Sequence, residues 1–387
     1  MSDKQTSLAQ LAFLFLKLGT IAFGGPAAHI AMMEDEVVRR RKWISREDFL
    51  DLLGATNLIP GPNSTELAIH IGHRRAGWAG FIVAGSCFIL PAALIVGAIS
   101  WAYVRYGSLP QAEGILYGVK PVVLAIVLQA IWRLARSALK TRLLWIVGAA
   151  AAVLSFVGLN ELAILFGTGA IVAAAGFSRK FKGAVGFMPG FWTAMVTAGG
   201  TVAATPFGLW AMFLVFVKIG SVLFGSGYVL LVFLRADLVD RLHWLTEGQL
   251  LDAIAIGQIT PGPVFTTATF IGYVLSGTPG AILATAGIFL PAFFFVAISG
   301  PLVPRLRRSQ IAGAFLDGVN AASLALMAVV MVQLARTALV DYAAIVIGIA
   351  ATVLLLRFNL NATWLVLGGT VAGIIIHLTN LQAWLRI

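Results

Sequence analysis

Two lysines in matching positions are the first candidates for binding a charged ligand. Lys17 interrupts an apolar run near the start of the chain, and Lys218 interrupts a second apolar run in the same way. An ammonium group at the bilayer centre costs about 2.5–3.5 kcal/mol on insertion scales, so two of them need a reason. One interpretation is that both lysines face a cavity and neutralise a bound anion. The alternative is that each side chain extends to the nearer membrane surface.

A helix-breaking tripeptide follows each lysine. Pro60-Gly61-Pro62 lies within "NLIPGPNSTELAIHIG", and Pro261-Gly262-Pro263 lies in the second half. Non-helical backbone at membrane depth is tolerated only where protein covers it or where it lines a water-filled cavity. The sequence therefore predicts that each tripeptide ends one half-helix and that a second half-helix starts after it. The free N–H groups at the start of this second half-helix would suit an anion. The alternative is a pair of kinks that serve packing alone.

Polar residues flank both tripeptides. Asn63, Ser64 and Thr65 are predicted to cap the helix that starts after the first break. Asn57 and Gln258 are matched amides, which either hydrogen-bond oxyanion oxygens or satisfy freed carbonyls. The candidate substrate-binding residues are Lys17, Lys218, Asn57, Pro60, Gly61, Pro62, Asn63, Ser64, Thr65, Gln258, Pro261, Gly262, Pro263 and Thr266.

Glu66 has no acidic counterpart in the second half, where threonines occupy the matching region. A buried carboxylate could carry a coupled proton, or it could be the counter-ion of Lys17 or Arg74. His70 and His73 stand three residues apart, but they lack a third metal ligand. The sequence therefore predicts neither a metal site nor a cofactor.

The composition indicates the elements that must position these groups. Of the 387 residues, 59% are hydrophobic and 11% are charged, whereas soluble domains carry about 25% charged residues. Apolar runs of membrane-spanning length recur without the alternation of a β-barrel, which predicts an all-α integral membrane protein. The runs lie at about 8–25, 49–72, 78–103, 114–139, 143–158, 161–176, 209–226, 250–273, 280–303, 314–338, 341–357 and 362–378. The single Cys87 excludes an internal disulfide.

The second half of the sequence repeats the first. "KLGTIAFGG" at Lys17–Gly25 matches "KIGSVLFGS" at Lys218–Ser226, and "LARSAL" at Leu134–Leu139 matches "LARTAL" at Leu334–Leu339. We predict a repeat at 1–182, a linker at 183–208 and a second repeat at 209–387. Transporters are commonly built from such repeats, with the substrate site at their interface. The alternative is that the repeat only enlarges a scaffold.

The distribution of Lys and Arg predicts the topology. Most of these residues fall on the cytoplasmic side if the first apolar run crosses from outside to inside, 49–72 dips in and returns, and 190–205 stays on the surface. Each half then has about five transmembrane helices plus one broken, re-entrant element. An odd number of crossings makes the second repeat inverted relative to the first. The net charge of +11 reflects cytoplasmic loops in this interpretation, not nucleic-acid binding.

Two long motifs resemble the signatures of the chromate ion transporter family. They are "FGGPAAHIAMMEDEVVRRRKWIS" with the first tripeptide, and "FGSGY" with "WLTEGQLLDAIAIGQITPGPVF" around the second. Besides the two tripeptides, the matching positions are Phe23, Gly24, Gly25, Pro26, Trp43, Phe224, Gly225 and Trp244. Ser226 departs from the pattern, in which a second glycine is usual. The resemblance covers nearly the whole chain and corresponds to the two-domain form of the family.

The resemblance implies an antiporter of the inner cell membrane that exports chromate under the proton-motive force, with sulfate as a similar oxyanion. The expected partners are the oxyanion, protons and the lipid bilayer, and a homodimer stays open. A sulfate or other anion carrier or channel is the alternative within transport. A membrane-embedded enzyme or scaffold is a remote alternative, because the sequence has no metalloprotease, nucleophile-elbow or P-loop motif. We therefore expect no enzymatic activity.

Overall fold

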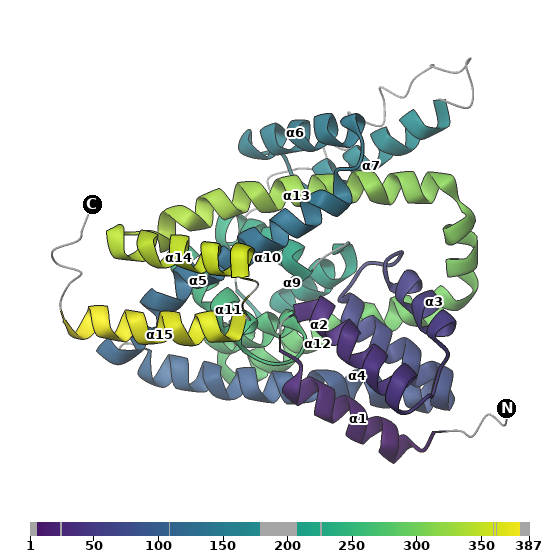
Figure 1. The fold of residues 1–387 in the computed structure, drawn as a ribbon, viewed down its shortest axis with the longest axis horizontal. Coiled ribbons are helices and arrows are strands. Elements are labelled where there is room, and N and C mark those ends of the chain that lie inside the picture. The colour runs from purple at the N-terminus through teal and green to yellow at the C-terminus, as the bar shows by residue number, and fades with distance from the viewer. Residues whose placement is uncertain are drawn as a thin grey trace.

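The computed structural model describes residues 6–23, 25–107, 109–178, 207–224, 227–358, 360 and 362–379, and within them every regular element is a helix (Figure 1). The predicted stretch 190–205, most of the predicted linker, and Gly24, Gly225 and Ser226 lie outside these residues. The first half contains α1 (Leu8–Ile21), α2 (Gly25–Glu34), the π-helix η1 (Asp35–Arg40), α3 (Arg46–Thr56), α4 (Asn63–Tyr106), α5 (Pro110–Ala138), α6 (Arg142–Phe156) and α7 (Glu161–Ser178). The second half contains α9 (Leu209–Val222), η2 (Gly227–Val229), α10 (Leu230–Leu234), η3 (Arg235–Arg241), α11 (Glu247–Ile259), η4 (Val264–Thr266), α12 (Thr267–Arg308), α13 (Gln310–Ala338), α14 (Tyr342–Phe358) and α15 (Ala362–Leu378).

Four helical stretches are long and apolar enough to cross a membrane. They are Asn63–Tyr106, Ala112–Ala138, Val264–Ser299 and Gln310–Ala338. Six shorter apolar helices accompany them, namely α1, α6, α7, α9, α14 and α15. Large apolar side chains point outward from several of these helices, as for Leu94 and Trp364, whose exposed fractions are 70% and 71%. Such surfaces suit lipid, which agrees with the predicted all-α membrane protein.

A tight reversal divides α4 and α12 at equivalent positions. Gly77 and Gly277 have φ of +59° and +61°, values that favour glycine. Gly72 and Gly80 then lie so close that a Cβ on Gly72 would come within 2.2 Å of the Gly80 carbonyl oxygen. The short first segment of each helix therefore packs antiparallel against the long second segment.

The start of α1 lies at the same end of the molecule as the reversal in α4. Arg75 donates from Nε to the Thr6 hydroxyl at 2.8 Å and from Nη1 to the Trp43 carbonyl at 2.8 Å. The prediction that the first apolar run crosses the membrane, starting on the side opposite to Arg74 and Arg75, is therefore wrong.

Length explains this error. α1 has 14 residues and is about 21 Å long, shorter than the roughly 30 Å hydrocarbon core. Beyond Ala22 the chain turns back through α2 and η1, and the Lys17 ammonium donates to Glu36 of η1 at 2.7 Å. The helix α1 therefore ends in the interior, and α2 and η1 return beside it.

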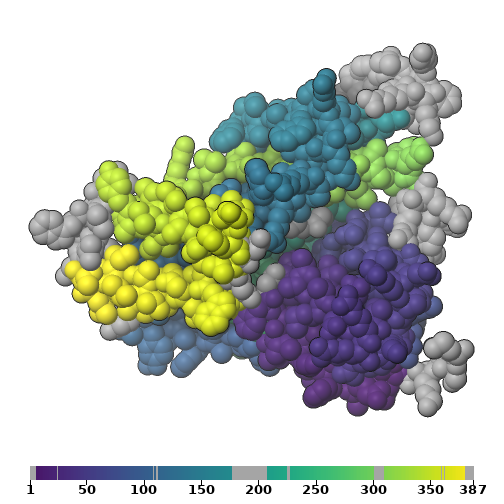
Figure 2. All heavy atoms as spheres, in the orientation of Figure 1, coloured from purple at the N-terminus to yellow at the C-terminus, as the bar shows by residue number. Residues whose placement is uncertain are grey.

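The last two helices of each half pack on the other half. α6 and α7 lie along α13, whereas α14 and α15 lie along α5 (Figure 1). Figure 2 shows the yellow C-terminal helices on the same face as the purple N-terminal residues. Glycines permit the closest approach, since Gly118 of α5 faces Gly369 and Gly373 of α15. The two halves are thus interlocked through reciprocal contacts.

α3 and α11 lie near opposite ends of the long segment of α4. Just before the reversal that begins this segment, Arg74 lies 3.7 Å from Asp48 of α3. Near its other end, the Tyr103 hydroxyl donates to Asp252 of α11 at 2.9 Å, and Lys120 forms an ion pair with Asp252 at 2.9 Å. The long segment of α4 therefore spans the distance between α3 at one end and α11 at the other.

We expect Gly118→Ala to destabilise the fold, because the new Cβ would lie 1.9 Å from the Gly369 carbonyl oxygen and backbone atoms cannot move aside cheaply. Overpacking of this kind costs about 1–3 kcal/mol. Gly97→Ala is the matched control, since it is also helical and a Cβ there meets no atom within 4 Å. The measurement is the thermal unfolding midpoint in detergent. Equal midpoints for the two variants would contradict the close contact between α5 and α15.

Candidate anion-binding cavity

The two Pro-Gly-Pro breaks are joined to opposite halves by backbone hydrogen bonds. The Gly61 N–H donates to the Leu223 carbonyl at the end of α9 at 2.7 Å, and the Gly262 N–H donates to the Ala22 carbonyl at the end of α1 at 2.9 Å. The φ angles of Gly61 and Gly262 are +139° and +87°, which explains the glycine between two prolines. Each break therefore satisfies a helix end of the other half.

An alanine of the other half lies beside each central glycine. A Cβ on Gly262 would lie 2.6 Å from the Ala92 Cβ, and a Cβ on Gly61 would lie 3.7 Å from the Ala292 Cβ. Ala92 and Ala292 occupy equivalent places in the repeat. The sequence prediction that each tripeptide interrupts a helix is confirmed, because α3 ends before the first and α11 before the second.

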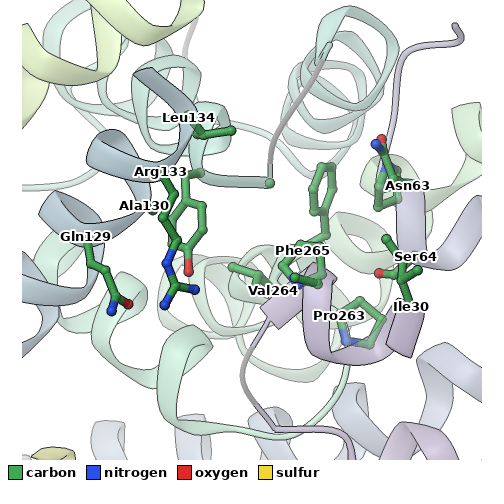
Figure 3. Close-up of a pocket in the computed structure, with 15 residues that line it drawn as sticks. Ile30, Asn63, Ser64, Gln129, Ala130, Arg133, Leu134, Pro263, Val264 and Phe265 are labelled. Atoms are coloured by element: carbon green, nitrogen blue, oxygen red, sulfur yellow. The ribbon is translucent and has the colours of Figure 1, made fainter. Parts of the chain in front are cut away.

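A cavity of about 280 Å³ lies where the two breaks meet (Figure 3). Gln129 and Arg133 of α5 lie on one side and Asn63 and Ser64 on the other, with Val264 between them. The full lining comprises Pro26, Ala27, Ile30, Pro62, Asn63, Ser64, Gln129, Ala130, Arg133, Leu134, Gly227, Tyr228, Pro263, Val264 and Phe265. The starts of α4 and of the η4–α12 stretch thus border one space.

The capping prediction for the first break is wrong. The N-cap of α4 is Pro62, which supplies no side-chain acceptor, and Asn63, Ser64 and Thr65 are already helical. The proline is extended, with φ of −78° and ψ of 91°, a conformation that suits a position before a helix. The start of α4 therefore has no side-chain cap, which favours an external anion there.

The polar side chains near the first break have other partners. Asn63 Nδ2 donates to Asn57 Oδ1 at 2.8 Å, so the Asn57 amide holds the helix start. The Ser64 hydroxyl lies 3.3 Å from His29 Nδ1. The Thr65 hydroxyl is buried and has no hydrogen-bond partner within the described chain. Of these groups only Asn63 and Ser64 line the cavity.

The second break is arranged differently. The Thr266 hydroxyl donates to the Pro263 carbonyl at 2.8 Å, and the Gln258 Nε2 is buried without a partner in the part of the chain described. Neither side chain lines the cavity, whereas Pro263, Val264 and Phe265 do. The matched amides Asn57 and Gln258 therefore have unlike surroundings.

Arg133 is the charged side chain that sequence reasoning missed. It lines the cavity, and no described carboxylate forms an ion pair with it. The topology prediction counted Arg133 only among the cytoplasmic Lys and Arg residues. A signal was nevertheless present, because Arg133 precedes "LARSAL" whereas Gln333 precedes the matching "LARTAL". The cavity thus has a cation where the repeat offers an amide.

The two predicted lysines lie outside this cavity and have carboxylate partners. Lys17 donates to Glu36 at 2.7 Å, and Lys218 donates to both oxygens of Asp237 at 2.8 and 2.9 Å. The Lys17 ammonium, together with Arg41, holds the pKa of the Glu36 carboxyl below its usual range. Neutralisation of an anion by these lysines stays a prediction, and their observed role is to pair equivalent acids.

Glu66 is fully buried beside the first break. Both of its carboxylate oxygens lack a hydrogen-bond partner within the described residues, and a Cβ on Gly61 would lie 2.3 Å from Oε1. It is not the counter-ion of either cation considered, because Lys17 pairs with Glu36 and Arg74 lies closest to Asp48. Its role as proton carrier stays a prediction. The described residues contain no group of three or more possible metal ligands.

The family-motif residues occupy different places in the structure, and some of them lie at the cavity. Pro26 lines it, and Gly25, with φ of +75°, lies close to Tyr228. The Trp43 N–H donates to the Val37 carbonyl, and the Trp244 N–H donates to the Leu238 carbonyl, both at 2.8 Å. Phe23 is partly exposed, and Phe224 lines a second cavity together with Asn57.

Comparison with known proteins assigns this all-helical membrane fold to a class. The sequence model of the chromate transporter family matches residues 9–177 and 210–374, so both halves are covered. The chain belongs to the chromate transporter family and is a multi-pass protein of the cell membrane.

Three relatives carry chromate in their names. The chromate transport protein of Cupriavidus metallidurans is 33% identical over 380 residues, covering 96% of this chain and 94% of the relative. The probable chromate transport protein of Synechococcus elongatus is 33% identical over 353 residues, covering 90% and 89%. The chromate transport protein of Pseudomonas aeruginosa is 32% identical over 393 residues, covering 95% of this chain and 92% of the relative. No solved structure matches the chain.

We expect Lys17→Met to lower the free energy of unfolding by about 1–3 kcal/mol, because it leaves the buried Glu36 without its nearest cation. The double variant Lys17→Met/Glu36→Gln should recover most of this loss. Since the folded pKa of Glu36 is depressed, the pair should stabilise above about pH 4.3 and lose its effect as the pH falls further. Chromate transport by the double variant separates the two roles. If Lys17 binds the anion, the double variant should lose transport. If Lys17 and Glu36 form only a structural pair, transport should be retained.

Proposed function

We propose that the chain is a secondary active transporter that exports chromate, a tetrahedral divalent oxyanion, from the cytoplasm. The observation that carries the proposal is the convergence of two uncapped helix starts and Arg133 on one cavity. Three relatives of nearly full length named as chromate transport proteins give the substrate class.

The charges around the cavity match a doubly negative guest. A helix start acts as roughly half a positive charge, so two starts and one guanidinium supply about two. Arg133 presents a planar set of donors that suits two oxygens of an oxyanion. The Gln129 amide and Ser64 hydroxyl, which also line the cavity, are further donors. Sulfate has the same shape and charge, so it is the natural competitor.

Inverted repeats, at 1–182 and 209–387, would give this transporter its alternating access. The contacts of Asp48 with Arg74, and of Asp252 with Tyr103, support the proposal, since they lie towards opposite ends of α4. The contact of Asp48 with Arg74 also supports a re-entrant element, because it joins the start of α3 to the end of the next segment. The end that carries Arg39, Arg40, Arg41, Arg46, Arg74 and Arg75 is then cytoplasmic.

Proton coupling completes the proposed cycle. Glu66 is a carboxylate at the inner end of the first broken element, fully buried and bordered by Gly61. A carboxylate without partners in apolar surroundings is stable mainly in its neutral form, so binding and releasing a proton there changes the charge beside the anion cavity. Exchange of inward protons for outward chromate would make the protein an antiporter.

Transport into inside-out membrane vesicles tests this function. We expect chromate uptake driven by an imposed pH gradient, competition by sulfate, and a loss of uptake of about tenfold or more in Arg133→Gln, since removing a charged hydrogen bond costs about 1.5–3 kcal/mol. Glutamine is the residue that the second half has at this position. The matched control is Arg136→Gln, one helical turn away, where the guanidinium stacks on Trp132 outside the cavity lining. Full uptake by Arg133→Gln would contradict the cavity as the binding site.

Cysteine labelling tests the inverted arrangement. In a Cys87→Ala background, Arg46→Cys reports the outer end of α3 and His243→Cys reports the loop before α11, and both native side chains are exposed. We expect a membrane-impermeant thiol reagent to label His243→Cys from outside the cell and Arg46→Cys only from the cytoplasmic side. Labelling of both positions from one side would contradict inversion.

A further inference from the structure

A line of titratable side chains runs from the cavity region along the first segment of α4. Glu66, His70 and His73 are four and three residues apart, so they share one face of the helix. Side chains on a helix lean towards its N-terminus, which directs His70 towards Glu66 and His73 towards His70. The two imidazoles are close enough to interact electrostatically.

The burial of these three groups decreases step by step. Glu66 is fully buried, His70 is partly buried with its Nε2 inaccessible, and His73 is exposed. Neither carboxylate oxygen of Glu66 nor the His70 Nε2 has a hydrogen-bond partner in the part of the chain described. Buried polar atoms without partners cost free energy and call for an explanation.

Packing alone does not explain them, because the second half supplies an internal control. The residues at the equivalent positions are Thr266, Phe270 and Tyr273. Thr266 satisfies its hydroxyl on the Pro263 carbonyl, and Phe270 is buried in the apolar core. The same helical reversal therefore forms without a carboxylate or an imidazole on this face.

The elements packed on α4 leave this line of groups isolated. The cluster around Ile69 and Phe81 contains apolar residues of the Ile59 loop and of α12, including Ala292 and Phe293. The charged groups of the other neighbours are engaged elsewhere: Lys17 of α1 pairs with Glu36, Asp48 of α3 lies near Arg74, and His29 of α2 contacts Ser64 and Ala22. Asp51 of α3 and Arg75 of α4 also have interactions of their own.

We propose that His70 relays protons between Glu66 and the end of the molecule where His73, Arg74 and Arg75 lie. This inference rests on the proposed proton coupling and assigns its route. The neutral His70 imidazole takes the proton of the Glu66 carboxylic acid, which leaves a carboxylate and an imidazolium. The imidazolium then passes one proton to His73 or to water there and becomes neutral again. One proton leaves Glu66 and one reaches water at this end of the molecule, and a proton taken up from the opposite side of the membrane reloads the acid in each transport cycle.

The test uses the full chain reconstituted in liposomes, with two measurements. Chromate counterflow, with equal pH on both sides, needs no net proton movement, because Glu66 returns to the same protonation state in each cycle. Accumulation of chromate against its gradient, driven by a pH difference and followed together with a pH-sensitive dye, requires the route. The variants are His70→Phe, which copies the second half, and His70→Gln. The control is His243→Gln, an exposed histidine outside the line.

We expect both His70 variants to lose driven accumulation and proton movement by about a hundredfold, the lower end of what a positioned proton-transfer group contributes. Counterflow should change far less, which shows that the variants fold and bind chromate. The pH dependence of the driven rate should also differ between the wild type and His70→Gln, because a glutamine side chain cannot carry the proton.

Three outcomes separate this inference from the proposed function. Driven accumulation at the wild-type rate and with the wild-type pH profile in both His70 variants would overturn the relay and leave chromate transport intact. Counterflow in the wild type, with neither accumulation of chromate nor proton movement when a pH difference is imposed, would overturn the coupling and the relay together. Absence of counterflow in the wild type would refute the proposed function itself.

Discussion

The arrangement of the centre depends on one constraint, which is that backbone N–H and C=O groups buried at depth must find partners inside the protein. Both tripeptides interrupt helices. The first helix of each half, α1 or α9, also ends in the interior of the protein. The Gly61 N–H donates to the Leu223 carbonyl, and the Gly262 N–H donates to the Ala22 carbonyl. Each tripeptide therefore satisfies a carbonyl at a helix end of the other half. Any movement of one half against the other must therefore preserve or exchange these bonds, and the cavity lies beside them.

The chemistry of the centre lies in the departures from internal repetition. The ion pairs Lys17–Glu36 and Lys218–Asp237 repeat, as do the glycine reversals, and these features build the scaffold. Arg133 and Glu66 do not repeat, because the second half has Gln333 and Thr266 there. A duplicated fold needs only one copy of a charged group beside a shared cavity. Two copies would add like charges at one point, where they repel one another.

The sequence predicted the helical membrane fold, the repeat and the breaks, because each leaves a local pattern of apolar runs or helix-breaking residues. The predictions that failed were non-local. The length of α1 was hidden because its apolar run continues past Ile21 into residues that turn back. The predicted caps after Pro62 were displaced because the proline itself occupies the N-cap position. The carboxylate partners of the two lysines were not predicted either, because Glu36 and Asp237 are reached only when η1 and η3 fold back.

The sequence by itself determined the family, the all-helical class and the positions of the two breaks, since these follow from hydropathy, composition and motif spacing. Only the tertiary structure decided which charges face the cavity, which carboxylate has no partner among the described residues, and which helices pack on the other half. The physical reason is that ion pairs, burial and helix packing depend on distances between residues far apart in the chain. Arg133 lines the cavity, and Glu66 is buried without a partner among the described residues, only because α5, the first break and the second half meet at one place.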